Sequence, residues 1–405
     1  MANIKYYICV TPFFPSPNRW QGAYVLDQVK SIKRQSDFNV VVFRTCTFSE
    51  KPRDYEIDGI LVREFQPWLM PSYILNGLTS EYVSKQFLHV LEKKGIDPKQ
   101  VAYIHCHTMN HISFGLGVRS VNPKAKVLVQ FHDLDPLTLR NGKWAEKGWN
   151  RKYRARKSVY LLNQADLLVC ISEPVRDSLL SFPKPRKGEV YPPALKMYDK
   201  LKGMPSVNSH NVYVLNNGVD TKLFYPSAAT NKDKTFRIGC IANFQDLKDH
   251  RTLVEAFNIL VQKGYTDMRL SLLGSGETKQ EIMEYIKEHQ LESYVEWPQE
   301  VQHDELPQYY RTLDLFVLPS RYEGFGCVYT EAYACGVPFI CCENQAAAEC
   351  IEQDEEAFWL AKDQNPEYLA VLIEQQYLEP KQQHLCRPYD IDVLINLFLN
   401  YLRTI

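Results

Sequence analysis

Two glutamates, Glu323 and Glu331, lie eight positions apart in the run RYEGFGCVYTEAYACG, and two glycines stand between them. The apolar run LFVLP upstream predicts a buried strand, and a helix is predicted to start near Cys327. A helix start reached through glycines presents backbone N–H groups to phosphate or sugar oxygens. About one turn into the helix, Glu331 can accept two hydroxyls of a ribose, while Glu323 lies near whatever group hangs beyond the phosphates. These residues predict a nucleotide-binding corner, with a solvated surface loop as the alternative.

The elements that would position this corner form two series along the chain of 405 residues. In each series, short apolar runs alternate with segments of helical periodicity, which predicts parallel strands covered by helices on both faces. A proline-rich stretch, from Ser181 to about Ser227, separates the two series. We therefore predict an α/β fold with a first domain over residues 1–205 and a second over residues 206–385. An apolar C-terminal helix, about 386–405, is expected to pack back on the first domain.

The bulk composition narrows the class of protein. A hydrophobic content of 45% with 23% charged residues is ordinary for a soluble globular chain, and a net charge of -1 argues against a nucleic-acid partner. Eleven cysteines without metal-ligand spacing predict reduced thiols in a cytoplasmic protein. The N-terminal apolar run is too short for a signal peptide, and no segment approaches the roughly 20 apolar residues of a membrane-spanning helix.

Several motifs, spread over nearly the whole chain, carry a resemblance to a known family. Besides PSRYEGFGCVYTEAYACGVP they are TPFFPSPNRWQG, VQFHD, ADLLVCISE, NNGVD, KDHRTLVEAF, LLGSGE and LPQYYRTLDLFVLPS. Together they resemble the GT4-type retaining glycosyltransferases (glycosyl transferases group 1), whose E-x7-E motif the first run matches. The resemblance implies a GT-B fold, in which two Rossmann-like doubly wound domains face a central cleft.

The resemblance also implies an activity. A nucleotide sugar, such as a UDP- or GDP-sugar, would bind the C-terminal domain as a substrate, and a glycan or lipid-linked acceptor would bind the N-terminal domain. A hexosyl or N-acetylhexosaminyl group would move to an acceptor hydroxyl with retention at the anomeric carbon, in the synthesis of a cell-surface polysaccharide or glycolipid. No cofactor and no essential metal are expected.

Carried onto this sequence, the family motifs assign roles to individual residues. Catalysis would rest on His132, on Glu323, which bonds the donor sugar, and on Lys248, which neutralises the departing diphosphate. Glu331 would bind the ribose of the donor, and the backbone amides of Phe325, Gly326 and Cys327 would hold its sugar and phosphates. Asn243 would offer a neutral side-chain amide, and Gly22 would let the backbone approach the phosphates. Alternatively, Lys248 is simply an exposed lysine and His132 a structural histidine. Gly22 could likewise be a plain turn glycine.

Two positions depart from the family pattern. The family arginine that shortly precedes the lysine is replaced by Asn243, whose neutral amide can bond a phosphate but cannot cancel its charge. Either Lys248 and helix N-termini suffice, or Arg19 or Arg321 substitutes, or the donor site is weakened. In ENQAAAECI, alanines stand where a glycine pair normally precedes the acid that corresponds to Glu349.

A metal site has little support in the sequence. Asp133 and Asp135 form a D-x-D pair, but the pair follows the family histidine and precedes a proline, so metal binding is the minor alternative. His105 and His107 are predicted to lie on alternate sides of a strand end, which argues against a shared metal.

Basic residues recur at three- and four-residue spacing between residues 140 and 154, with two tryptophans interleaved. The basic residues are Arg140, Lys143, Lys147, Arg151 and Arg154. This spacing predicts one face of a helix, which either contacts anionic lipid headgroups on the inner face of the membrane or is simply solvated. The apolar segment 68–78 would adjoin this face or belong to the core.

Two other classes of function remain open. The missing arginine leaves room for a non-catalytic GT-B homologue that acts as a partner subunit of a glycosyltransferase complex. A nicotinamide dehydrogenase has only the alternation of strands and helices in its favour, because no G-x-G-x-x-G follows the first strand.

Overall fold

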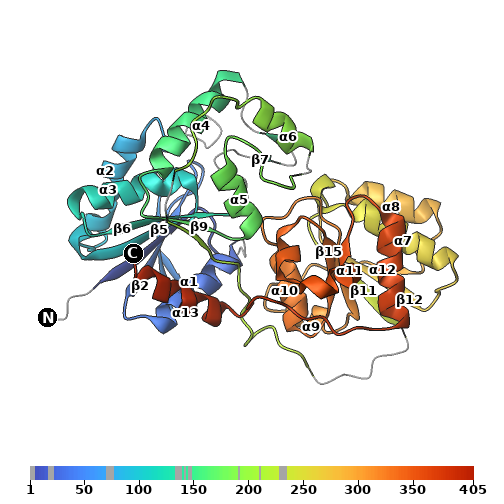
Figure 1. Ribbon diagram of the computed structural model, residues 1–405. Helices are drawn as coiled ribbons and strands as arrows, with labels where there is room; N and C mark the ends of the chain where they lie inside the picture. The colour runs from blue at the N-terminus through green and yellow to red at the C-terminus, as the bar shows by residue number, and fades with distance from the viewer. Residues whose placement is uncertain are drawn as a thin grey trace. The chain divides into compact units, whose positions relative to one another are not determined.

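The computed structural model divides the chain into two compact units (Figure 1). The described residues are 5–16, 22–69, 77–132, 139–140, 143–144, 148–189, 192–208, 211–227 and 235–405. Unit 1 comprises Met1–Gly218 and Ile391–Ile405, and unit 2 comprises Val219–Asp390. Each unit has its own sheet and its own hydrophobic core.

Unit 1 is built on an eight-stranded sheet with the order β10-β9-β6-β5-β1-β2-β4-β3. The strands are β1 (Tyr6–Thr11), β2 (Asn39–Thr45), β3 (Tyr55–Ile57), β4 (Ile60–Phe65), β5 (Val101–Cys106), β6 (Lys126–Phe131), β9 (Leu167–Cys170) and β10 (Val212–Val214). All neighbours pair in parallel except β3, which is antiparallel to β4. The strand order reverses between β1 and β5. In open α/β sheets, ligands bind at the carboxyl ends of the strands beside such a switch point.

Helices cover both faces of this sheet, so its central strands are buried almost from end to end instead of alternating. Helices α1 and α13 lie on one face, and α2 and α3 lie on the other (Figure 1). The helices of unit 1 are α1 (Ala23–Gln35), α2 (Ser80–Lys93), α3 (Ile112–Val121), α4 (Gly148–Leu162), α5 (Glu173–Ser181), α6 (Pro192–Asp199) and α13 (Ile391–Leu402). The short strands β7 (Leu139–Arg140) and β8 (Lys143–Trp144) form a separate antiparallel pair.

The C-terminal helix α13 packs against α1 and joins the core of unit 1. Ser31 Oγ and a guanidinium nitrogen of Arg34 donate hydrogen bonds to Asp392 Oδ1 at 2.6 and 2.5 Å. The units divide after Gly218 and after Asp390, later than the positions 205 and 385 expected from composition. Strand β10 explains the first difference, because its pairing with β9 places the chain beyond residue 205 in unit 1. A three-residue edge strand inside a proline-rich stretch leaves little trace in composition.

Unit 2 has a six-stranded sheet with the order β13-β12-β11-β14-β15-β16, in which every pairing is parallel. The strands are β11 (Phe236–Ile241), β12 (Met268–Leu273), β13 (Val295–Glu296), β14 (Leu315–Leu318), β15 (Phe339–Cys342) and β16 (Leu360–Ala361). The order reverses between β11 and β14. The carboxyl ends of these two strands therefore flank the switch point of this unit.

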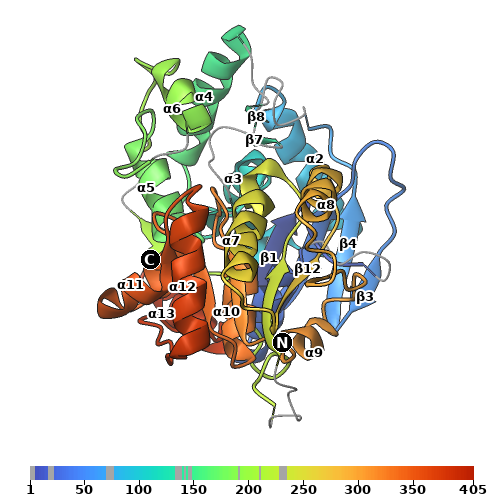
Figure 2. The same ribbon diagram turned by 90° about the vertical axis from the view of Figure 1, so that its right-hand side faces the viewer.

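The helices of unit 2 follow the strands as the sequence predicts. They are α7 (His250–Gln262), α8 (Lys279–Glu288), α9 (Leu306–Tyr310), α10 (Cys327–Ala334), α11 (Glu356–Trp359) and α12 (Pro366–Leu378). Helices α7 and α12 pack side by side, as Figure 2 shows. The 3-10 helices of the chain are η1 (Pro98–Gln100), η2 (Met109–His111), η3 (Asp246–Lys248), η4 (Ala346–Cys350) and η5 (Gln353–Glu355). The predicted fold class, α/β with doubly wound parallel sheets, is confirmed.

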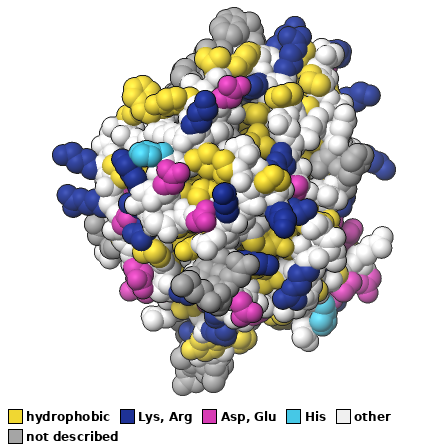
Figure 3. Space-filling view, turned by 90° about the vertical axis from the view of Figure 1, so that its left-hand side faces the viewer, with side chains coloured by type: hydrophobic (Ala, Val, Ile, Leu, Met, Phe, Trp, Pro, Cys, Tyr) yellow, Lys and Arg dark blue, Asp and Glu magenta, His cyan; other side chains and the backbone are white. Residues whose placement is uncertain are grey.

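Polar and apolar side chains are mixed on the surface. On the face drawn in Figure 3, Lys and Arg side chains are interspersed with Asp, Glu and hydrophobic side chains. Within the described part of the chain, no helix has both the length and the apolar character needed to cross a bilayer.

Candidate active site

The switch point of unit 2 brings together two residues that are far apart in the sequence. Lys248 ends η3, in the loop after β11, and Glu323 lies in the loop after β14. Lys248 Nζ lies 2.5 Å from Glu323 Oε1. The two loops are tied by the backbone N–H of Arg321 and the hydroxyl of Ser320, which both donate to the carbonyl of Leu247, at 2.8 and 2.9 Å. The predicted lysine and the first predicted glutamate therefore form one charged pair at a strand edge.

Gln345, which the sequence did not single out, fixes the loop that carries the glutamate. Its side-chain Oε1 accepts from the backbone N–H of Glu323 at 2.9 Å, and its Nε2 donates to the carbonyl of Arg321 at 2.9 Å. The Gln345 side chain is buried and belongs to the run ENQAAAECI after β15. A glutamine that bonds a backbone has no spacing pattern by which sequence alone could find it.

Helix α10 begins directly beyond this pair and presents the positive end of its dipole there. Gly326 caps the helix with a φ of 83°, in the left-handed region. A Cβ at this position would lie 2.6 Å from the ring of Tyr329 and 3.7 Å from Cδ of Glu323. Glycine is therefore required both by the backbone conformation and by the close approach. Phe325 is buried and Cys327 is half-buried, so what Phe325 can offer a ligand is its backbone amide.

Glu331 lies on α10 with only 7% of its surface exposed. Its Oε2 accepts a hydrogen bond from Tyr310 at 2.8 Å, and its Oε1 lies 3.4 Å from His303 Nε2. Burial, followed by the charge of Glu331, raises the pKa of Tyr310 well above its usual range, so the hydroxyl stays protonated and donates. Tyr310 lies in the quoted motif LPQYYRTLDLFVLPS, whereas nothing in the sequence points to His303.

Asn243 and Arg321 are placed differently from the charged pair. Asn243 is exposed in the loop after β11. The Arg321 guanidinium lies 3.6 Å from Asp246 and 3.8 Å from Asp363, so acids already surround it. Glu349, which follows the alanine run, lies 3.7 Å from Arg387. Of the two cations of this unit that the sequence singled out, Lys248 contacts the predicted carboxylate of Glu323, whereas Arg321 lies near other acids.

Unit 1 carries histidines at the carboxyl ends of β5 and β6, beside its own switch point. His132 Nε2 lies 3.2 Å from His107 Nδ1, and the two rings are stacked. His132 also contacts the ring of Tyr24, with 5.1 Å between the centroids. Burial lowers the pKa of His132 to about 4, so the ring is neutral at neutral pH. Its Nδ1 has no hydrogen-bond partner among the described residues.

The prediction that His105 and His107 lie apart is wrong, because their ring centroids are 4.4 Å apart. Side chains two residues apart along a strand point to the same face, so the alternation of β5 itself brings the two rings together at the strand end. His105 Nδ1 bonds Tyr7 at 2.7 Å, and burial lowers the pKa of His105 to about 3. Over the described residues, no group of three or more metal-ligating side chains is arranged to hold a metal ion. Asp133 and Asp135 lie outside the described residues.

Gly22 caps α1 with a φ of 92°. A Cβ there would lie 2.5 Å from the carbonyl oxygen of Phe13. The local turn therefore requires glycine in its own right, and the role of Gly22 toward phosphates stays a prediction. Arg19 lies outside the described residues.

The predicted basic helix face does not form as expected. Arg140 and Lys143 lie in the strands β7 and β8. Their side chains, and the whole of Lys147, lie outside the described part of the structure. Arg154 is 1% exposed and Arg151 is half-buried on α4, where the exposed basic residues are others, such as Lys152 and Arg156. Spacing alone could not show that Arg154 shares the inward face of α4 with Ser158 and Val159.

Two family models match the chain. Residues 21–197 match the model described as Glycosyltransferase Family 4, and residues 224–391 match the one described as Glycosyl transferases group 1. The first range contains the histidines of unit 1, and the second contains Lys248, Glu323 and Glu331.

Curated relatives match parts of the chain. The putative glycosyltransferase EpsF of Bacillus subtilis is 33% identical over 149 residues, which are 35% of this chain and 38% of that protein. The alpha-monoglucosyldiacylglycerol synthase of Acholeplasma laidlawii is 26% identical over 203 residues, which are 44% of this chain and 50% of that protein. The chain thus spans about a third to a half of the length of the curated relatives that it matches.

Solved structures match over nearly the full length. Sucrose-phosphate synthase from Thermosynechococcus elongatus is 18% identical, with a TM-score of 0.71 and coverage of 99% of each chain. HepE from Anabaena, in complex with UDP and glucose, is 16% identical, with a TM-score of 0.65 and coverage of 98% of this chain and 99% of that one. At these identities the likeness shows the fold, and the GT-B fold implied by the motifs is confirmed.

Proposed function

Because the chain belongs to the family 4, or group 1, glycosyltransferases, we propose that it transfers a sugar from a nucleotide-sugar donor to a hydroxyl of a glycan or lipid-linked acceptor, with retention at the anomeric carbon. The observation that carries the proposal is the pair of Lys248 and Glu323 at the switch point of unit 2. It places a cation and a carboxylate beside the start of α10. A sugar diphosphate needs such an arrangement, because its phosphates gain charge as the sugar departs.

The proposed reaction exchanges one bond of the anomeric carbon for another. The bond to the diphosphate oxygen breaks, and the acceptor oxygen forms its bond on the same face of the sugar. The acceptor proton passes to the leaving phosphate oxygen. Lys248 neutralises the charge that develops on the diphosphate, while Glu323 accepts hydrogen bonds from the donor sugar and Glu331 from the ribose. Each of these roles is part of the proposal.

The comparisons suggest where a substrate search starts. HepE from Anabaena was solved with UDP and glucose, and the relative from Acholeplasma laidlawii is by name a glucosyldiacylglycerol synthase. These names favour UDP-glucose as the first donor and diacylglycerol as one acceptor. The group proposed to be transferred is a hexosyl or an N-acetylhexosaminyl group. The proposed location is the cytoplasm, at the inner face of the membrane. Synthesis of a surface polysaccharide or glycolipid is the proposed pathway class.

Turnover of donors by the full chain tests the proposal. We expect one of UDP-glucose, UDP-N-acetylglucosamine or GDP-mannose to release its nucleotide, and the release to fall to background in Glu323→Ala. Glu284→Ala, which removes an exposed glutamate of α8, serves as the matched control. The anomeric proton coupling of the first-formed product reports retention or inversion. An inverted product would contradict retention, and release that persists in Glu323→Ala would contradict the assigned site.

A non-catalytic partner subunit is the second candidate. Asn243 favours it, since an exposed neutral amide stands where the family has an arginine, and the charge of Lys248 is already opposed by Glu323. This candidate predicts that the chain binds a nucleotide sugar but releases no nucleotide at any donor concentration. Asn243→Arg would then leave turnover at background.

A further inference from the structure

Two exposed aromatic rings stand together at the carboxyl edge of the sheet in unit 1. Phe48 is 65% exposed and Trp68 is 61% exposed. Their ring centroids lie 5.8 Å apart, and the ring planes meet at 72°. Single exposed apolar side chains are common on proteins. Two large rings left together in water are less common, because burying their apolar area would stabilise the fold. Such a pair is therefore a candidate binding surface.

The corner arises from two neighbouring parallel strands. Thr45, the last residue of β2, is the register partner of Phe65, the last residue of β4. Phe48 and Trp68 each follow their strand end by three residues. This is the same edge of the sheet at which β5 and β6 end and at which His107 and His132 lie. Ligands of parallel α/β sheets bind along this edge.

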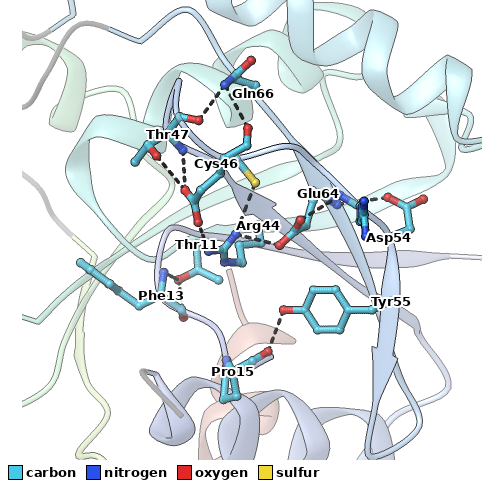
Figure 4. A network of polar contacts seen from close by, with 12 residues as sticks. Thr11, Phe13, Pro15, Arg44, Cys46, Thr47, Asp54, Tyr55, Glu64 and Gln66 are labelled. Carbon is cyan, nitrogen blue, oxygen red and sulfur yellow. Dashed lines mark hydrogen bonds and ion pairs between the residues drawn. The ribbon is translucent and has the colours of Figure 1, made fainter. Parts of the chain in front are cut away.

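A buried ion network holds the loop that carries Phe48 (Figure 4). Arg44, at 8% exposure, bonds Glu64 at 2.7 Å with one guanidinium nitrogen and Glu50 at 2.6 Å with the other. Glu50 in turn accepts from the backbone N–H and the hydroxyl of Thr47, at 2.7 and 2.9 Å. Thr47, the residue before Phe48, is thus fixed by Glu50, whose side chain is 32% exposed and whose partner Arg44 is buried. The pair is partly shielded from water, so its strength lies between that of a surface pair and that of a buried pair.

A second set of bonds ties the loop of Trp68 to that of Phe48. Gln66 Nε2 donates to the carbonyl of Thr47 at 2.6 Å, a contact that Figure 4 shows. Gln86, on α2, accepts from the backbone N–H of Trp68 at 3.1 Å and donates to the carbonyl of Gln66 at 3.2 Å. The hydroxyl of Thr79 donates to the carbonyl of Trp68 at 3.1 Å. The two rings therefore extend from backbone that is ordered before any ligand arrives, and preorganisation of this kind lowers the cost of binding.

We propose that Phe48 and Trp68 form a stacking platform for one pyranose ring of the acceptor. The inference rests on the proposed function and names the chemical class of group that unit 1 recognises. The negative face of an aromatic ring attracts the polarised C–H bonds on one face of a pyranose, and the second ring contacts its edge. The exposed hydroxyls of Thr47 and Ser49, 3.0 Å apart beside Phe48, lie near the sugar hydroxyls at the rim. A lipid chain would gain from the apolar area of the two rings but not from the angle between them, whereas a pyranose ring uses both.

Saturation-transfer NMR on the full chain, without donor, tests the platform. The probes are the methyl α-pyranosides of glucose, mannose, galactose and N-acetylglucosamine. We expect at least one of them to receive saturation at its ring C–H protons, and the signal to fall at least fivefold in Phe48→Ala and in Trp68→Ala. Trp68→Phe should keep most of the signal because it keeps a ring. Tyr160→Ala, which removes an equally exposed ring (63%) from α4, should change nothing.

Other outcomes overturn the platform. It fails if none of the four glycosides receives saturation, or if the signal survives both alanine variants. It also fails if these variants lose only co-sedimentation with phosphatidylglycerol vesicles, since the rings would then contact lipid. The donor assay separates this result from the proposed function. If the chain releases nucleotide but Trp68→Ala does not change glycoside binding, the platform alone is overturned. If glycoside binding depends on the two rings but no nucleotide is released, the proposed transferase activity alone is overturned.

Discussion

Both units are built on a sheet with a switch point beside its first strand, wholly parallel in unit 2 and parallel except for β3 in unit 1, yet their strand ends carry different chemistry. In unit 2 the ends of β11 and β14 carry the charged pair of Lys248 and Glu323. In unit 1 the ends of β5 and β6 carry histidines whose pKa values burial lowers to about 4 for His132 and well below the usual value for His107, so both are neutral at neutral pH. The ends of β2 and β4 lead to exposed aromatic rings.

This difference shows that topology fixes where a site can form and that side chains decide what it binds. A charged strand edge suits a diphosphate whose charge rises during reaction. An edge with neutral histidines and exposed aromatic rings suits a neutral sugar, because stacking and neutral hydrogen bonds do not need a counter-charge.

Apart from the loss of turnover expected in Glu323→Ala, the largest effect is expected from Lys248→Ala. Loss of the cation that faces the departing diphosphate should cost about 3 kcal/mol in kcat/KM, a fall of roughly 150-fold, by analogy with the loss of one donor to a developing oxyanion. Steady-state kinetics of nucleotide release measures it. Lys263→Ala, which removes a lysine paired with Glu374 on the same unit, should be neutral. If Lys248→Ala keeps near-normal kinetics, the counter-charge is elsewhere. Asn243→Arg should restore part of the loss, since both positions would share one partner.

The two glutamates should separate binding from turnover. Glu331→Ala removes a carboxylate that would contact a ribose, which does not change during reaction, so donor affinity should fall by about 2 kcal/mol with little effect on kcat. Glu323→Ala should lower kcat instead, because the sugar it contacts gains charge in the transition state. Equal losses of kcat in both variants, with donor affinity unchanged, would count against these roles.

Tyr310→Phe should act on Glu331 indirectly. The variant keeps the buried ring but removes the hydroxyl that holds Oε2, which leaves one carboxylate oxygen free to turn. We expect donor affinity to weaken by about 1.5 kcal/mol while kcat stays the same. A merely structural role would lower the melting temperature and leave the donor KM unchanged, so both quantities are to be measured.

The smallest effect concerns His132, at the end of β6 in unit 1. The folded pKa of His132, about 4, lies below its unfolded value near 6.5. As the pH falls, this histidine is protonated in the unfolded chain before it is protonated in the folded chain. The free energy of unfolding is therefore highest above pH 6.5 and falls as the pH drops toward 4. His132→Gln should remove about 1 kcal/mol of this loss between pH 6.5 and 5, since the ring is partly exposed. Urea unfolding at several pH values measures it.

His89→Gln is the matched control for this pH dependence, because its side chain is 64% exposed on α2. A slope that is the same in wild type and His132→Gln would show that His132 titrates normally in the folded chain.

The sequence predicted the fold class and the charged corner because both depend on local signals. Apolar runs mark the strands, and the glycines around Glu323 mark the helix start. It could not predict Tyr310 or Gln345 as supports of the two glutamates, since these contacts cross between elements and need no fixed spacing. Arg154 was misplaced for a related reason. Periodicity defines a helix face but does not say which face turns inward, and residues 140 and 143 lie in a hairpin instead.

The charged edge of unit 2 is the place where we propose that a nucleotide diphosphate binds. Calorimetric titration of UDP and of GDP into the full chain and into Lys248→Ala tests this directly. We predict that one of the two nucleotides binds the wild-type chain at a single site and binds Lys248→Ala at least tenfold more weakly. Failure of both nucleotides to bind, or equal affinities for the two proteins, would contradict the account.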